Sequence, residues 1–88
     1  MTIVNDMKIR NSVAQAAQRA LDNHQPRKYR ITVNEDAILE EDGWYHIVVT
    51  TPNDMRDRDF YDALAQAEAE LQDQAGGHQY LLVPAVGD

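Results

Sequence analysis

The stretch "EEDGWYHIVVTT", residues 40–51, contains the clearest turn and the clearest strand in this chain of 88 residues. Asp42 and Gly43 form an Asp-Gly pair, which readily adopts the positive φ angles that a two-residue hairpin turn requires. From Trp44 to Thr51 apolar side chains occur on both faces of an extended chain, which is typical of a strand that is covered on two sides or lies centrally. The stretch therefore predicts a β-hairpin.

The strand before this turn is predicted from "YRITV", residues 29–33, in which the odd-numbered residues are apolar and share one face. Further along, Ala37 and Leu39 keep the odd-numbered register, whereas Glu35 interrupts it. We therefore expect a bulge or a widened edge near Glu35.

A helix is predicted on the N-terminal side of the hairpin, over residues 5–23. Asn5 or Asp6 is suited to cap its start, and Pro26 disfavours helix at the residue before it. The apolar residues recur at helical spacing and predict the buried stripe, which consists of Ile9, Val13, Ala16, Ala17, Ala20 and Leu21.

A second helix is predicted on the other side of the hairpin, beginning within "PNDMRDRDF", residues 52–60, and ending at Gly76-Gly77. Asn53, Asp54 or Asp57 is suited to cap its start. Its apolar stripe consists of Phe60, Leu64, Ala67, Leu71 and Ala75. The segment "YLLVPAV", residues 80–86, predicts a final strand, with Pro84 at its end or at an edge position.

These elements predict a single small α+β domain over residues 1–88, in the order α–β–β–α–β. The hairpin makes the first two strands antiparallel, and the helical crossover makes the last two parallel. Both helices then cover one face of a three-stranded mixed sheet, which is a two-layer sandwich. The exits of the last two strands, at "TTPND" and "PAVGD", are expected at the same end of the sheet, where α/β proteins tend to place ligands.

The composition bounds the function. The net charge is −7, with 15 acidic and 8 basic residues, so nucleic acid and anionic membranes repel the chain at long range. There is no cysteine, the N-terminus has no long apolar run, and no segment approaches membrane-spanning length. We therefore expect a cytoplasmic protein without membrane contact, and we find no motif for a cofactor.

The acidic cluster of Asp54, Asp57 and Asp59 suggests a metal-dependent hydrolase, an alternative that we keep open. The arginines at positions 56 and 58 lie among these carboxylates and can neutralise them without an ion. The spacing also lacks the glycine and the distal glutamate of a calcium loop. Capping of the second helix accounts for the same residues directly, so we expect no catalysis.

The basic cluster of Arg27, Lys28 and Arg30 suggests a contact with RNA or a nucleotide, with Tyr29 available for stacking. The helix–hairpin–helix–strand order is similar to that of one class of single-stranded RNA-binding domain. The glycine-bracketed loop with which such domains clamp the nucleic-acid backbone is missing here, and the rest of the chain is acidic. Nucleic-acid binding is therefore the alternative rather than the leading hypothesis.

The leading hypothesis is a non-catalytic binding or regulatory module that contacts a protein partner or a second copy of itself, as a homodimer. Trp44, His46 and Val48 alternate along the predicted central strand and share one face. If both helices cover the other face, these side chains form an exposed apolar patch, which marks an interaction site. A secondary contact surface is predicted on the outer side of the second helix, at Asp62, Glu70 and Asp73, which could dock a basic partner.

Overall fold

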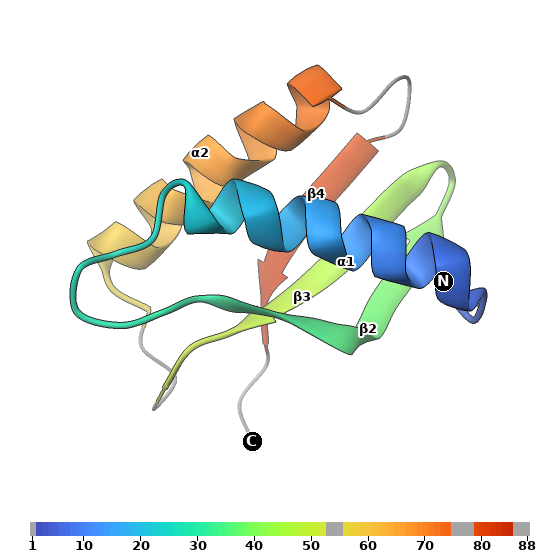
Figure 1. Cartoon of the computed structure of the whole chain (residues 1–88), viewed down its shortest axis with the longest axis horizontal. Helices are drawn as coiled ribbons and strands as arrows, with labels where there is room; N and C mark the ends of the chain where they lie inside the picture. The colour runs from blue at the N-terminus through green and yellow to red at the C-terminus, as the bar shows by residue number, and fades with distance from the viewer. Residues whose placement is uncertain (1, 53–55, 75–78, 86–88) are drawn as a thin grey trace.

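The computed structural model describes residues 2–52, 56–74 and 79–85. These described residues form two helices and four strands (Figure 1). In chain order they are β1 (Thr2–Ile3), α1 (Met7–Asp22), β2 (Thr32–Glu41), β3 (Trp44–Thr50), α2 (Arg58–Gln74) and β4 (Gln79–Pro84).

The four strands form one mixed sheet in the order β1-β2-β3-β4. The predicted antiparallel β2–β3 pair and the predicted parallel β3–β4 pair are both confirmed. The prediction of three strands in the order α–β–β–α–β is wrong, because Thr2 and Ile3 add an antiparallel strand opposite Glu40 and Leu39. A strand of two residues has no alternation that sequence periodicity could reveal.

A bulge interrupts β2 in the region where Glu35 breaks the sequence pattern. The register shifts between the Val33–Val49 pair and the Ile38–Ile47 pair, so residues 34–37 lie opposite Val48 alone. The bulge is confirmed, but the expectation that Leu39 keeps the register of Val33 is wrong. Because five positions separate Val33 from Ile38, the even-numbered residue Ile38 turns to the core and Leu39 turns to the opposite face.

The hairpin turn has the conformation that the sequence predicts. Asp42 has φ of 51° and Gly43 has φ of 85°, so both central residues are left-handed. Apart from Gly43 and its two chain neighbours, no atom lies within 4 Å of the position that a Cβ on Gly43 would occupy. The requirement for glycine there is therefore one of backbone conformation and not of space.

Both helices pack on one face of the sheet and share one core with it (Figure 1). The predicted stripe of α2 is confirmed from Phe60 to Leu71, while Ala75 lies outside the described residues. The predicted stripe of α1 is rotated slightly, because Ala14 is buried and Ile9 is 43% exposed. The molecule measures 33 × 31 × 19 Å, a thickness that fits two layers spaced about 10 Å apart and leaves no room for a third.

Aspartates cap both helices. Asp6 accepts hydrogen bonds from the backbone N–H groups of Lys8 and Ile9, which confirms one of the two residues predicted there. Asp57 precedes α2 and accepts from the Phe60 N–H at 3.0 Å, so one of the three predicted caps is confirmed. The other two predicted caps, Asn53 and Asp54, and the glycines expected to end α2 lie outside the described residues.

Candidate functional site

The sheet face opposite the helices is apolar at its centre and is not covered by any described residue. Along β3, Tyr45, Ile47 and Val49 are buried against the helices, whereas the residues between them are only partly buried or exposed. The structure therefore places the predicted partner-binding residues Trp44, His46 and Val48 together on the uncovered face. We call this surface the open face, and its residues are Ile3, Leu39, Trp44, His46, Val48, Leu81 and Val83.

The open face is continuous across all four strands. Leu39 is the Cα partner of both Ile3 and His46, and His46 is in turn the partner of Leu81, so four side chains form one row. Beside this row, Val48 is paired with Val83. Ile3 is 54% exposed and Trp44 is 37% exposed, and no member of the face is fully buried.

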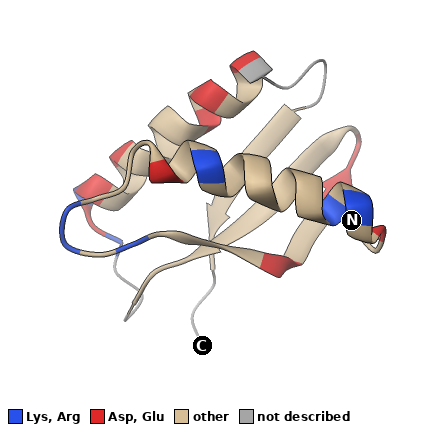
Figure 2. Cartoon of the chain, viewed as in Figure 1, with Lys and Arg blue, Asp and Glu red and all other residues tan. Residues whose placement is uncertain are grey.

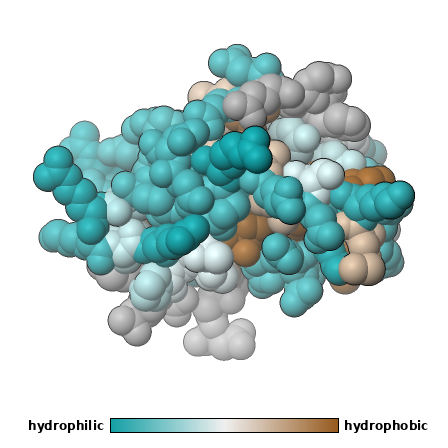
Figure 3. Space-filling view, in the orientation of Figure 1, coloured by the Kyte–Doolittle hydropathy of each residue, from teal (hydrophilic) through white to brown (hydrophobic). Residues whose placement is uncertain are grey.

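Apolar residues on a water-facing sheet are unusual, because antiparallel strands with one solvated face normally alternate apolar and polar residues. At the centre of the open face six of these seven side chains are apolar, with His46 as the exception, whereas the ends of the same face carry the polar residues Glu41 and Gln79, and Thr32 and Thr50. By contrast, the helix side of the molecule presents a mostly hydrophilic surface (Figure 3). Of the open-face residues, our sequence reasoning missed Ile3, Leu39, Leu81 and Val83. Alternation within "YLLVP" could have assigned the last two.

The outer edge of β2 is closed by glutamine side chains. The Ile31 N–H donates to Gln25 Oε1 at 2.7 Å, and Gln25 Nε2 donates to the Ile31 carbonyl at 2.9 Å. A residue in a neighbouring strand would pair with Ile31 through the same two hydrogen bonds, one accepted from its N–H and one donated to its carbonyl. Gln18 continues the contact by accepting from the Val33 N–H at 2.8 Å. The strand begins at Thr32, so the predicted start at Tyr29 is wrong.

The free edge of β4 is closed in a similar way by Glu68 of α2. The Ala85 N–H donates to the Val49 carbonyl on β3. Because the N–H groups of successive residues point to opposite sides of a strand, the N–H of Leu82 and the nitrogen of Pro84 point to the free edge of β4. Leu82 donates this N–H to Glu68 Oε1 at 2.7 Å, and proline has no N–H to donate. Burial raises the pKa of Glu68 above its usual value. The start of β2 and the free side of β4 therefore each lack a full set of backbone groups for strand addition, and the other edge strand, β1, has two residues.

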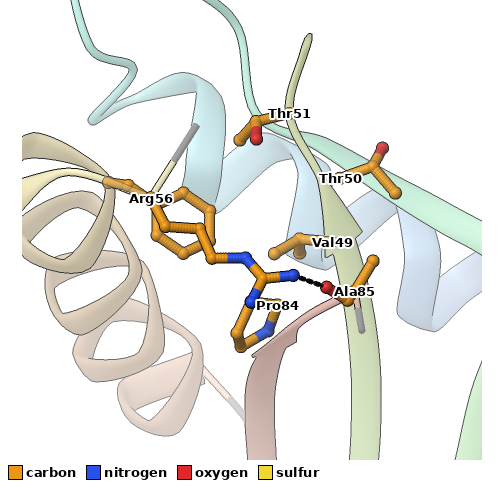
Figure 4. A pocket seen from close by; sticks show the side chains of 7 residues that line it. Val49, Thr50, Thr51, Arg56, Pro84 and Ala85 are labelled. Carbon is orange, nitrogen blue, oxygen red and sulfur yellow. Dashed lines mark hydrogen bonds between the residues drawn. The ribbon is translucent and has the colours of Figure 1, made fainter. Parts of the chain in front are cut away.

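The strand exits that we expected to share one end of the sheet do lie side by side, with Val49 paired to Pro84. Figure 4 shows the Arg56 side chain reaching across this end to donate a hydrogen bond to the Ala85 carbonyl. The remaining cavity, lined also by Thr50, has a volume of about 10 Å³. A cavity of this size holds about one water molecule, so Arg56 fills the place where a ligand would lie.

The acidic cluster is only partly visible, because Asp54 lies outside the described residues. Asp57 accepts a hydrogen bond from the Tyr29 hydroxyl at 2.5 Å in addition to its capping bond. The Tyr29 hydrogen bond is the main cause that lowers the pKa of Asp57. Asp59 is exposed at the start of α2. Over the residues that the structure describes, no three His, Cys, Asp or Glu side chains are grouped so that they could hold a metal ion.

The basic cluster lies in the loop between α1 and β2, where acidic groups face it (Figure 2). Arg30 forms an ion pair with Asp22 at 3.3 Å. Tyr29 packs against the core, and burial together with its hydrogen bond to Asp57 raises its pKa to about 12. Its ring is therefore held by the protein and is poorly placed to stack on a base. The side chains of Arg27 and Lys28 remain exposed.

The predicted acidic surface of α2 is divided between two environments. Asp62 and Asp73 are exposed, and Asp62 lies 3.9 Å from Arg58 one turn earlier. Glu70 instead turns toward the C-terminus of α1, where it accepts hydrogen bonds from the Asn23 amide and lies 3.6 Å from His24. Glu70 therefore joins the two helices and is not part of a freely exposed acidic face.

Two open grooves occur on the helix side. One, of about 300 Å³, lies between the α1–β2 loop and α2 and is lined by both charges, including Arg27, Asp59 and Asp62. The other, of about 380 Å³, lies between the first turns of α1 and the stacked rings of Tyr45 and Tyr80. These volumes are at the lower end of those of small-molecule sites. The second groove is also lined by Lys8 and Ser12, which lie one turn apart on α1.

The fold and the surface define a two-layer α+β domain with one open apolar sheet face. No family model, curated protein or solved structure matches the chain. None of the described helices is both long and apolar enough to cross a membrane.

Proposed function

We propose that this domain is a non-catalytic binding module whose contact surface is the open face around Trp44, His46 and Val48. The observation that carries the proposal is the apolar centre of a sheet face that no described residue covers. Water in contact with such a face is unfavourable by about 25 cal/mol for each Å² of apolar surface, and a partner removes that contact.

The side-chain bonds along the strand edges favour a partner that packs on the open face over one that adds a strand to the sheet. Gln25 and Gln18 bond the backbone at the start of β2, and Glu68 bonds the Leu82 N–H on β4. A partner that added a strand would have to displace these bonds and leave polar groups unpaired. A partner that packs side chains against Trp44 and Val48 displaces none of them.

Binding is better supported than catalysis or a nucleic-acid contact. Among the described side chains, Asp57 caps a helix and holds Tyr29, while Arg30 is paired with Asp22. The residues suggested for chemistry or for base stacking therefore have structural contacts that account for them.

Site-specific photo-crosslinking in the native cell tests the proposal. A benzophenone amino acid replaces Trp44 in one variant and Tyr61 in the matched control, because Tyr61 is an exposed aromatic residue, 52% exposed, on the helix layer. We expect discrete protein adducts at position 44 that are absent at position 61, with both variants folded by circular dichroism. Equal crosslinking at the two positions, or none at position 44, would contradict the proposal.

A further inference from the structure

Charge is segregated between the two layers of the molecule. All eight lysines and arginines lie on α1, in the α1–β2 loop, or at and just before the start of α2 (Figure 2). The described strands contain no lysine or arginine at all, whereas β2 alone contains four acidic residues, which are Glu35, Asp36, Glu40 and Glu41. The formal charge of the described strands is therefore entirely negative and lies on β2 alone.

Three of these acids border the open face. Glu41 is the Cα partner of Trp44 at the hairpin end, and Glu35 and Asp36 are exposed in the bulge opposite Val48. An apolar centre with acidic residues at two ends of its border is complementary to an apolar surface flanked by cations. A second copy of the same face would offer these acids no cation, because its described strands contain no lysine or arginine.

The dimensions of the face match a helix. A strand of seven residues, the length of β3, spans about 23 Å, and a helix of that length has about 16 residues. The other face of the same sheet is covered by helices of 16 and 17 residues. A helix satisfies its own backbone hydrogen bonds and so needs nothing from the closed strand edges.

From these observations we propose that the open face binds a basic amphipathic helix of about four turns, whose apolar stripe covers Trp44 and Val48 and whose lysines or arginines lie beside Glu41 and the bulge. This inference rests on the proposed function, since it names the class of partner for the same surface. The nearest source of cations on the chain itself is the helix layer, on the other side of the sheet.

Two synthetic helices test the inference on the intact domain. Both have about 16 residues with one leucine stripe and no tryptophan, and they differ only in carrying lysine or glutamate on the remaining positions. Trp44 is the only tryptophan of the chain, so its fluorescence reports occupation of the open face. We expect a blue shift with the lysine helix that weakens as salt is added, and at least tenfold weaker binding of the glutamate helix.

Because any cationic peptide is attracted to a chain of net charge −7, a matched pair of variants locates the contact. Asp36→Asn with Glu41→Gln removes two border charges, and Asp62→Asn with Asp73→Asn removes two charges from the outer side of α2. We expect the first pair to weaken binding about three- to tenfold and the second by less than about twofold, because direct surface ion pairs are worth a few tenths to 1 kcal/mol each. Equal losses, or a larger loss from the α2 pair, would overturn the inference.

The inference can fail without the proposed function failing. If the lysine and glutamate helices bind equally while crosslinks at position 44 capture a protein, the open face is a docking surface but its partner is not cationic. If light scattering shows a dimer at micromolar concentration and Trp44 becomes buried with it, the occupant is a second copy of this chain. Either result would refute the basic helix.

Discussion

Replacement of Gln25 by alanine tests whether a side chain substitutes for a neighbouring strand at the edge of β2. The change removes the acceptor of the Ile31 N–H and one of the two donors to the Ile31 carbonyl. Ile31 is fully buried, so water does not readily replace the lost acceptor. A buried donor without a partner costs about 1–3 kcal/mol, whereas the carbonyl keeps its 3.2 Å bond from Gln18.

We therefore expect Gln25→Ala to lower the free energy of unfolding by about 2 kcal/mol. For a domain of this size, 1 kcal/mol corresponds to about 4–8 °C, so the melting temperature should fall by roughly 8–16 °C. Urea unfolding followed by Trp44 fluorescence measures the first quantity, and differential scanning calorimetry measures the second. Amide hydrogen exchange should show lost protection at Ile31 in particular.

Two further variants sharpen this experiment. Gln72→Ala removes an exposed glutamine from α2 and should change stability by less than about 0.5 kcal/mol. Gln25→Glu keeps an acceptor for the Ile31 N–H but loses the donor and places a second carboxylate beside Asp22, so its effect should be intermediate. If Gln25→Ala were as stable as Gln72→Ala, the hydrogen bonds between Gln25 and Ile31 would contribute nothing measurable to stability. The start of the β2 edge would then be open to strand addition.

Substitutions at three other positions have expected outcomes that follow from local structure. Gly43→Ala should lower the free energy of unfolding by about 1 kcal/mol in urea titration, because alanine disfavours the left-handed φ although space is available. Asp57→Ala should lower the melting temperature more than Asp57→Asn, since asparagine still caps α2 and still accepts from Tyr29. Burial raises the pKa of Glu68, so its protonated form favours the folded state, and wild-type stability relative to Glu68→Gln should rise as pH falls from neutral toward 4.5. The lowered pKa of Asp57 has the opposite sign: the stability that it contributes is present above pH 3.8 and is lost as pH falls further through its folded value.

The elements with strong local signals could be predicted from the sequence. The Asp42-Gly43 turn, the alternation along β3 and the buried stripe of α2 each depend on spacing within one segment, and all three are confirmed. The presence of the β2 bulge could also be predicted, because Glu35 interrupts an apolar pattern. The face to which Ile38 and Leu39 turn after the bulge could not be predicted. The number of residues that oppose Val48 is fixed by the pairing of two strands and not by either strand alone.

The missed features depend on contacts between distant segments. β1 exists because Thr2 and Ile3 meet Glu40 and Leu39, and nothing within the first few residues indicates that meeting. The role of Gln25 was equally hidden, because a glutamine after a helix reads as solvated surface until the chain places it against Ile31. The open face was predictable at its centre, where alternation along β3 was clear, but its width depends on the neighbours that pairing brings to it.

The open face and the closed edges together limit how this domain can recognise a partner. An exposed apolar sheet with free edges would pair indiscriminately with other strands, and the bonds from Gln25 and Glu68 occupy backbone groups that such pairing at the start of β2 or on β4 would need. In the binding mode that we propose, the partner packs its side chains on the face around Trp44, and specificity comes from shape and from the acids on β2. Those carboxylates then favour a cationic partner over a second copy of the face, whose described strands have no lysine or arginine.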